Sequence, residues 1–84
     1  MNISKVERRV LNALALGGHI AFQKDENGQI ETLDCITREG WFLDGFDMSL
    51  FKKLRSKRMI VSHNGGPYRI TRRGIEALQA ARQA

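Results

Sequence analysis

The 84-residue sequence has few of the features that mark membrane, secreted or disulfide-bonded proteins. Its single cysteine, Cys35, cannot form an internal disulfide and fits a reducing compartment. Its longest apolar run, Ala13 to Leu16, is far shorter than the roughly 20 residues that a membrane-spanning helix needs. The segment Met1 to Lys5 lacks the basic and apolar regions of a secretory signal peptide. We therefore expect a cytoplasmic protein that makes no contact with a membrane.

Residues that would mark an enzyme or a metal protein are equally scarce. The only histidines are His19 and His63, and neither a CxxC nor an HxxxH spacing indicates structural zinc. No glycine-rich phosphate loop precedes a helix. We therefore expect no catalytic residue, no cofactor and no metal. One enzymatic alternative remains, a ribonuclease in which His63 acts as general base with Tyr68 or Arg69 nearby.

The charged residues are unevenly distributed along a chain whose length fits one domain, residues 1–84. The net charge is +5, but the segment from Met1 to Asp47 carries 5 basic and 8 acidic residues. The segment from Met48 to Ala84 carries 9 basic residues and a single acidic one, Glu76. A net charge of +8 in that segment indicates that the C-terminal half faces a polyanion.

The N-terminal segment predicts a helix from Lys5 to Leu16. Ser4 and Glu7 have the spacing of a capping box, and Gly17-Gly18 ends the helix. Helical spacing predicts an inner face made of Ile3, Val6, Val10, Ala13 and Leu14.

The next segment predicts a β-hairpin, His19 to Gln23 paired with Gln29 to Thr37 around a two-residue Asn27-Gly28 turn. This register gathers the apolar residues on one face and buries Cys35. Its pairs are Ile20 with Cys35, Phe22 with Leu33, and Lys24 with Glu31. We expect the following apolar segment, Trp41 to Leu43, to be buried.

A basic helix is predicted from Met48 to Arg58, capped by Asp47. Its buried face consists of Leu50, Phe51 and Leu54. The opposite face carries Ser49, Lys52, Lys53 and Ser56, with Arg55 and Lys57 beside them.

The remaining segment predicts a second hairpin and a last helix. Strands Ile60 to His63 and Tyr68 to Thr71 would pair His63 with Tyr68 and Val61 with Ile70. Thr71 would cap a helix from Arg72 to Arg82, with Ile75, Leu78 and Ala81 facing inward. Arg72 and Arg73 stand in its first turn, where the helix dipole disfavours cations and a polyanion would relieve the conflict.

The segment from Asp47 to Leu78 resembles the winged-helix DNA-binding fold: a basic helix runs into a strand, a glycine-rich hairpin follows, and Thr71 caps a helix with Gly74 in its first turn. The resemblance implies a winged-helix-like α+β fold with three helices and two β-hairpins. The sequence departs from that fold between Gly18 and Leu43, where a hairpin replaces the usual supporting helix. We predict a DNA contact made by Ser49, Lys52, Lys53, Arg55, Ser56, Lys57, Arg69, Arg72 and Arg73.

The whole chain resembles the YjhX family of small bacterial proteins, through Asn2 to Gly18, Thr37 to Gly40, Phe51 to Leu54 and Pro67 to Thr71. The resemblance implies the toxin of a toxin–antitoxin pair that acts on DNA or on a DNA topoisomerase, and an antitoxin partner. An alternative to DNA binding is a module that inhibits a topoisomerase through its acidic hairpin residues Asp25, Glu26, Glu31 and Asp34. A homodimer through the first or last helix is compatible with the sequence.

Overall fold

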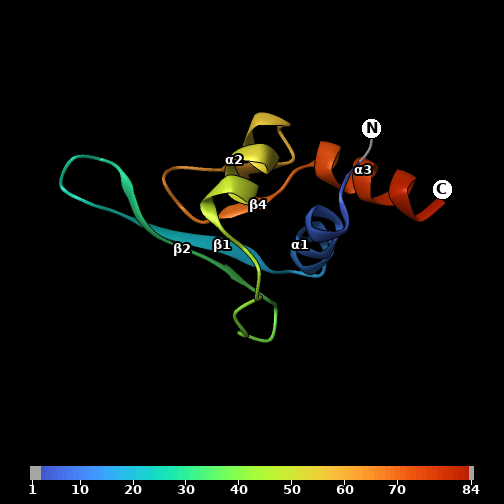
Figure 1. Ribbon diagram of the computed structural model, residues 1–84, viewed down its shortest axis with the longest axis horizontal. Helices are drawn as coiled ribbons and strands as arrows, with labels where there is room; N and C mark the ends of the chain where they lie inside the picture. Colours follow the sequence, from blue (N-terminus) through green and yellow to red (C-terminus); the bar gives the residue numbers. More distant parts are fainter. Residues whose placement is uncertain (1–2, 84) are drawn as a thin grey trace.

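The computed structural model describes residues 3–83 as three helices and a four-stranded antiparallel sheet (Figure 1). The predicted α+β class with two β-hairpins is confirmed. The sheet order is β2-β1-β4-β3, so the two hairpins join where Ile20 of β1 pairs with Tyr68 of β4. The elements are α1 (Lys5–Ala15), β1 (His19–Lys24), β2 (Ile30–Ile36), α2 (Met48–Ser56), β3 (Ile60–Ser62), β4 (Tyr68–Ile70) and α3 (Arg72–Gln83).

Helix α1 begins at the predicted capping box and ends one residue earlier than predicted. Ser4 Oγ accepts a hydrogen bond from the Glu7 backbone N–H at 3.1 Å, and the Glu7 carboxylate accepts one from the Ser4 N–H at 2.9 Å. Gly17 then takes a φ of +113°, a left-handed conformation that stops the helix. The local sequence is sufficient to fix both ends of α1.

The buried stripe of α1 is rotated from the predicted one. Val10 and Leu14 are buried as predicted, but Val6 is about half exposed, and Leu11 is fully buried in its place. The stripe runs through Glu7, Val10, Leu11 and Leu14, at positions i, i+3, i+4 and i+7. Hydrophobic periodicity assigns only apolar residues to a buried face. It therefore predicted Val6 and not Glu7 for this position.

The first hairpin has the predicted register near its base and a different one at its tip. Ile20 pairs with Cys35 and Phe22 with Leu33, as predicted. The predicted pair of Lys24 with Glu31 is wrong, because a β-bulge shifts the register and Lys24 pairs with Ile30.

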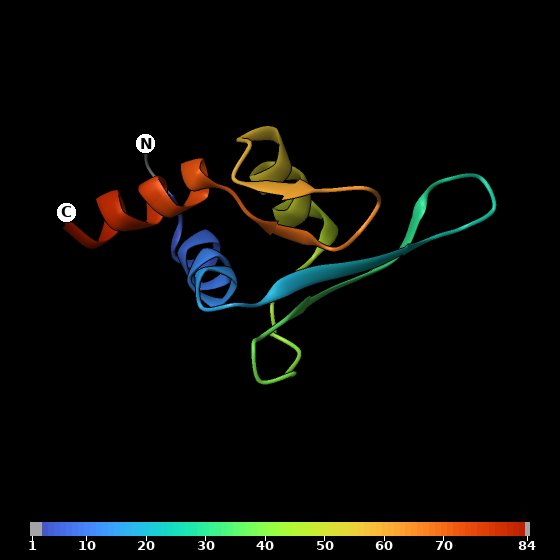
Figure 2. The same cartoon turned by 180° about the vertical axis from the view of Figure 1, so that it is seen from behind.

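The turn at the hairpin tip is wider than the predicted two-residue turn. The Asp25 backbone N–H donates to the Gln29 carbonyl at 2.8 Å, which leaves residues 26–28 as the loop. The Asp25 carboxylate accepts hydrogen bonds from the backbone N–H groups of Asn27 and Gln29, and only Gly28 takes a positive φ. Asp25 thus stabilises a three-residue loop followed by a bulge, in preference to the tighter Asn-Gly turn. Figure 2 shows this hairpin projecting away from the three helices as a long arm.

The segment from Trp41 to Leu43 is mostly exposed, so the prediction of burial is wrong. Trp41 and Phe42 are 72% and 69% exposed, and only Leu43 packs against the core. The Thr37 N–H donates to the Trp41 carbonyl, and the Leu43 N–H donates to the Cys35 carbonyl. The chain therefore turns back beyond the end of β2, where Trp41 and Phe42 do not contact the core. It contacts the core again at Leu43.

The second hairpin is displaced by one residue from its predicted register. Ile60 pairs with Ile70, Val61 with Arg69 and Ser62 with Tyr68. The connection is longer than predicted, and Ser62 Oγ donates to the Gly66 carbonyl at 2.6 Å across it. A shift of one residue reverses the faces of a strand, so Val61 lies at the surface and Ile60 is buried.

Helix α3 begins at the predicted cap and buries Leu78 as predicted, but it buries Ala77 in place of Ile75. Thr71 Oγ1 accepts a hydrogen bond from the Gly74 N–H at 3.1 Å. Gly74 is buried so close to β3 that a Cβ atom there would lie 2.6 Å from the Met59 carbonyl oxygen. This contact sets the rotation of the helix, which buries Ala77 and Leu78 and leaves Ile75 39% exposed.

The core lies where α1, α2 and α3 meet the central strands. Phe51, Leu54 and Met59 are fully buried there, together with Leu11 and Ile20. The rings of Phe22 on β1, Tyr68 on β4 and Phe51 on α2 pack edge to face, with centroids 5.5 Å and 4.9 Å apart. This packing fixes which face of α2 is turned to the solvent.

Candidate nucleic-acid interface

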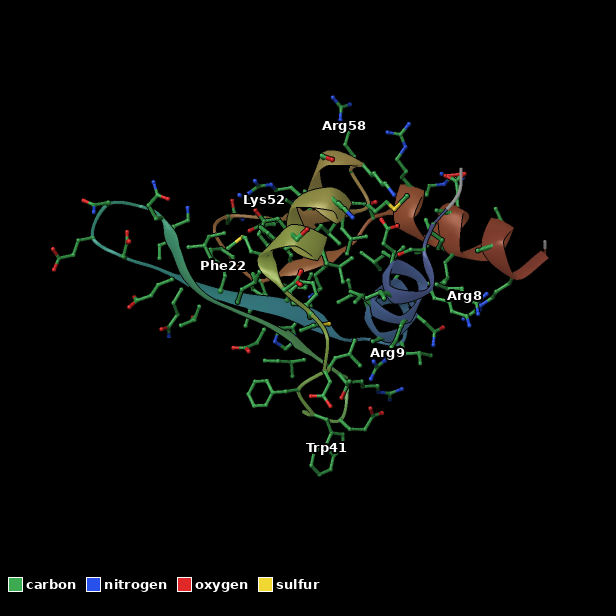
Figure 3. The ribbon with its side chains drawn as sticks, viewed as in Figure 1. Arg8, Arg9, Phe22, Trp41, Lys52 and Arg58 are labelled. Carbon is green, nitrogen blue, oxygen red and sulfur yellow. The ribbon has the colours of Figure 1, made fainter. Side chains whose placement is uncertain are left out.

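Helix α2 presents a polar, cationic face because its other face is anchored in the core. The Asp47 carboxylate caps the helix by accepting a hydrogen bond from the Leu50 N–H at 2.8 Å, and Leu50, Phe51 and Leu54 are buried. Five predicted contact residues are exposed on the opposite side, which we call the α2 face: Ser49, Lys52, Lys53, Arg55 and Ser56. Lys52 is labelled on the upper side of α2 in Figure 3.

Arg55 is held in position on the α2 face. Its guanidinium carbon lies 5.0 Å from the centre of the Phe51 ring, which is itself immobilised in the core. A cation over an aromatic ring is attracted to it without losing its charge. Arg55 therefore presents a partly ordered guanidinium beside Lys52, and both residues line a hollow between α2 and the start of β2.

Three further arginines lie where α2, β3 and α3 meet, and we call them the basic junction: Arg58, Arg72 and Arg73. Thr71 joins these segments, because its Oγ1 donates to the Arg58 carbonyl at 2.8 Å and its backbone N–H donates to the Met59 carbonyl at 2.9 Å. All three arginines are exposed. The junction thus extends the cationic α2 face toward α3.

Sequence reasoning missed Arg58 as a contact residue and assigned it only as a helix end. Its φ of +61° turns the chain sharply after α2 and directs Arg58 to the edge of the molecule (Figure 3). Glycine and asparagine are the usual residues in this conformation. Nothing in the local sequence therefore signals the turn.

Lys57 lies apart from the exposed cations, although it was predicted with them. Its Nζ atom lies 2.7 Å from Glu7 Oε2, and the two side chains are 32% and 5% exposed. Burial by itself raises the pKa of Glu7, but hydrogen bonds from Lys57 and Ser4 outweigh it, so that the pKa is lowered. The charge of Lys57 is thus neutralised within the protein.

Arg69 also lies apart from the α2 face. Its neighbour Tyr68 packs against Phe51 of α2, and successive residues of a strand point to opposite faces. Arg69 pairs with the surface residue Val61. The structure therefore places Arg69 on the side of the hairpin that is turned away from α2.

The residues of the ribonuclease alternative lie at the turn of the second hairpin and on the strand that follows it. His63 is exposed in the turn, while Tyr68 and Arg69 point to opposite sides of β4. Cys35 is buried, and burial raises the pKa of its thiol to about 11. Within residues 3–83, no three side chains of the types that bind metal ions lie together.

Comparison with known proteins then identifies the chain. A family model described as "Putative toxin of bacterial toxin-antitoxin pair" matches residues 1–84. This protein belongs to the YjhX family. The resemblance found in the sequence is confirmed.

Relatives of this YjhX-family chain match it along nearly their whole length. A UPF0386 protein of Rhodospirillum centenum is 61% identical over 79 residues, which cover 94% of this chain and 92% of the relative. A UPF0386 protein of Chelativorans sp. is 51% identical over 80 residues, with 95% and 94% covered. One of Myxococcus xanthus is 49% identical over 78 residues, with 93% and 92% covered.

No solved structure matches the chain, so the winged-helix resemblance stays a prediction. In the part of the chain that the structure describes, none of the helices has the length and apolar character needed to cross a membrane.

Proposed function

We propose that this YjhX-family toxin binds double-stranded DNA through the α2 face and the basic junction. The proposal rests on six exposed cations. They lie on α2, in the turn that follows it and at the start of α3: Lys52, Lys53, Arg55, Arg58, Arg72 and Arg73. None of them lies within 4.0 Å of a carboxylate oxygen of residues 3–83. Phosphates are the partners that compensate such a set of charges.

The dimensions of α2 fit this role. An α-helix such as α2 is about 10–12 Å across with its side chains, and the major groove of B-DNA is about 12 Å wide, so the helix can lie in the groove. Ser49 and Ser56 are short residues at either end of the α2 face, so the helix backbone can approach the duplex closely. The start of α3 supplies Arg72 and Arg73, whose repulsion from the helix dipole a phosphate would relieve.

Arg69 and Lys57 are not part of the proposed contact. Lys57 is paired with Glu7, and Arg69 lies on the far side of its hairpin. We therefore revise the predicted set of nine residues to seven, and add Arg58 from the structure. The proposed activity is binding and requires no catalytic group, cofactor or metal.

A salt titration of a labelled duplex tests the proposal. Each lysine that neutralises a phosphate contributes about 0.9 to the slope of log affinity against log salt concentration, so Lys52→Ala should reduce the slope by about 1. Lys24→Ala is the matched control, because Lys24 is an exposed lysine on the hairpin arm. Equal effects of the two substitutions would show that net charge, and not the α2 face, determines binding.

A supercoiling assay separates the proposal from the topoisomerase alternative. If the protein acts on DNA itself, Lys52→Ala with Lys53→Ala should abolish any effect on supercoiling together with duplex binding. If it acts on the enzyme, supercoiling should slow although the protein binds no duplex. Charge reversal at Glu31 and Asp34 would then remove the inhibition, because in this alternative these carboxylates contact the topoisomerase.

A further inference from the structure

A second cationic surface lies between α1 and α3, apart from the α2 face. The hollow has a volume of about 460 Å³ and is lined by Lys5, Arg8, Arg9, Asn12, Leu78 and Arg82. Four of these six residues are cations, and none of the lining residues of the described chain is acidic. We call this hollow the α1–α3 groove.

The positions of the cations follow from the way α1 is buried. Its stripe of Glu7, Val10, Leu11 and Leu14 faces the core. Lys5, Arg8 and Arg9 occur at helical spacing outside this stripe, and Arg82 comes from the last turn of α3. An Arg82 Nη2 hydrogen bond to Asn12 Oδ1 joins the two helices across the groove. Like charges held together in this way favour an anionic occupant.

A smaller, partly apolar hollow adjoins the groove and shares Arg9 and Asn12 with it. It has a volume of about 200 Å³, and its other lining residues are Ala13, Leu16, Thr37, Arg38, Glu39 and Leu43. Leu16 is 64% exposed at the end of α1. The Arg38 side chain packs over Gly17, where an added Cβ would lie 3.4 Å from Arg38 Cδ. The loop that carries exposed Trp41 and Phe42 is therefore held next to the end of α1.

We propose that the α1–α3 groove and the adjoining hollow bind an acidic, amphipathic peptide segment of a protein partner. Carboxylates of the segment would pair with Arg8, Arg9 and Arg82, and its apolar side chains would cover Leu16 and the Trp41 loop. A phosphodiester backbone offers no apolar counterpart to Leu16, whereas buried apolar and aromatic contacts next to charge pairs are typical of protein interfaces. The proposal goes beyond DNA binding and does not rest on it.

The two proposed surfaces lie on different sides of the molecule. In Figure 3, Arg58 and Lys52 lie along the upper edge, whereas Arg9 and Trp41 lie along the lower edge. The first surface is formed by α2 and the start of α3, and the second by α1, the end of α3 and the loop after β2. The two surfaces share no residue, so variants can separate the two activities.

A designed peptide provides the probe. It is a helix of about 18 residues, long enough to follow α1 from Lys5 to Leu16, with glutamates along one face and leucines along the other. Trp41 is the only tryptophan of the chain and is 72% exposed, so its fluorescence reports whether the peptide covers the loop. We expect saturable binding with a shift of Trp41 emission to shorter wavelength. A peptide with glutamine in place of glutamate should bind at least about tenfold more weakly, because the charge pairs are lost.

Matched double variants locate the binding site. Arg8→Glu with Arg9→Glu should weaken peptide binding by about tenfold or more, since each removes a charge pair and adds a repulsion. Lys52→Glu with Lys53→Glu makes the same change of net charge on the α2 face and should leave peptide affinity within about twofold, because these residues are remote from the groove. Leu16→Gln keeps the charge and should weaken peptide binding while leaving duplex binding unchanged. Circular dichroism melts verify that each variant is folded.

Three results would overturn the proposal. The first is equal loss of peptide binding in the two double variants, which would make the attraction one of net charge alone. The second is loss of duplex binding in Arg8→Glu with Arg9→Glu but not in Lys52→Glu with Lys53→Glu, which would assign the groove to nucleic acid. The third is self-association in sedimentation that the Arg8 and Arg9 changes abolish, which would place a second copy there. Failure of DNA binding by the α2 face leaves the expected peptide results unchanged.

Discussion

Glu7 and Lys57 join α1 to the end of α2 across 50 residues of sequence, with 2.7 Å between Oε2 and Nζ. Glu7 also accepts the hydrogen bond that completes the capping box with Ser4. One carboxylate thus serves both the start of α1 and its packing against the segment that follows α2. The pair holds in place the two helices whose outer surfaces carry the proposed contacts.

Removal of the lysine should destabilise the fold. Lys57→Met leaves a buried carboxylate without its cation, and we expect a loss of about 1–3 kcal/mol in the free energy of unfolding, below the range for fully buried pairs because Lys57 is partly exposed. Urea denaturation measures the loss. Duplex affinity should not change when the protein is folded, because the charge of Lys57 is already neutralised. A clear fall in duplex affinity would show that Lys57 does contact DNA.

The same pair predicts how stability depends on pH. Because the pKa of Glu7 is lowered in the folded protein, its contribution to stability is present above the pKa of the unfolded chain and is lost as pH falls through the folded pKa. In Lys57→Met, burial should dominate and raise the folded pKa of Glu7 above its value in the unfolded chain. The ionised carboxylate then destabilises the fold at neutral pH, and its protonation in acid removes that destabilisation. Plots of urea midpoint against pH, measured for the two proteins from neutral to acidic pH, should therefore differ in shape. Parallel curves would contradict the role of the pair.

The Cys35 thiol should be unreactive in the folded protein. The side chain is buried, and its pKa of about 11 leaves almost no thiolate at neutral pH. A chromogenic disulfide reagent should label Cys35 at least about a hundredfold more slowly under native conditions than in denaturant. Fast labelling without denaturant would mean that the base of the first hairpin opens readily.

Gly74→Ala should destabilise the protein although alanine is the better helix former. On helix propensity alone the change would favour folding by up to about 1 kcal/mol. The new Cβ would lie 2.6 Å from the Met59 carbonyl oxygen and 2.7 Å from Ile70 Cγ1, and we expect a net loss of about 1–3 kcal/mol. Thermal denaturation shows directly whether the substitution raises or lowers stability. Increased stability would show that α3 can move away from β3 without cost.

The sequence by itself determined the local features of this protein. Ser4 and Glu7, Asp47, and Thr71 define three helix starts, since a cap needs only neighbours a few residues away. The spacing of Leu50, Phe51 and Leu54 was sufficient to identify the exposed side of α2, because that helix has one uninterrupted apolar stripe. Most of the α2 face was therefore predictable.

Only the tertiary structure decided the features that depend on distant residues. The partner of Glu7 lies 50 residues away, so neither the rotated stripe of α1 nor the pairing of Lys57 could be read locally. The contact of Gly74 with Met59 rotates α3, and the length of the turn after Ser62 places Arg69 on the far side of its hairpin. The α1–α3 groove joins residues from the two ends of the chain. Helical and strand periods assign side chains to faces, but packing decides what each face meets.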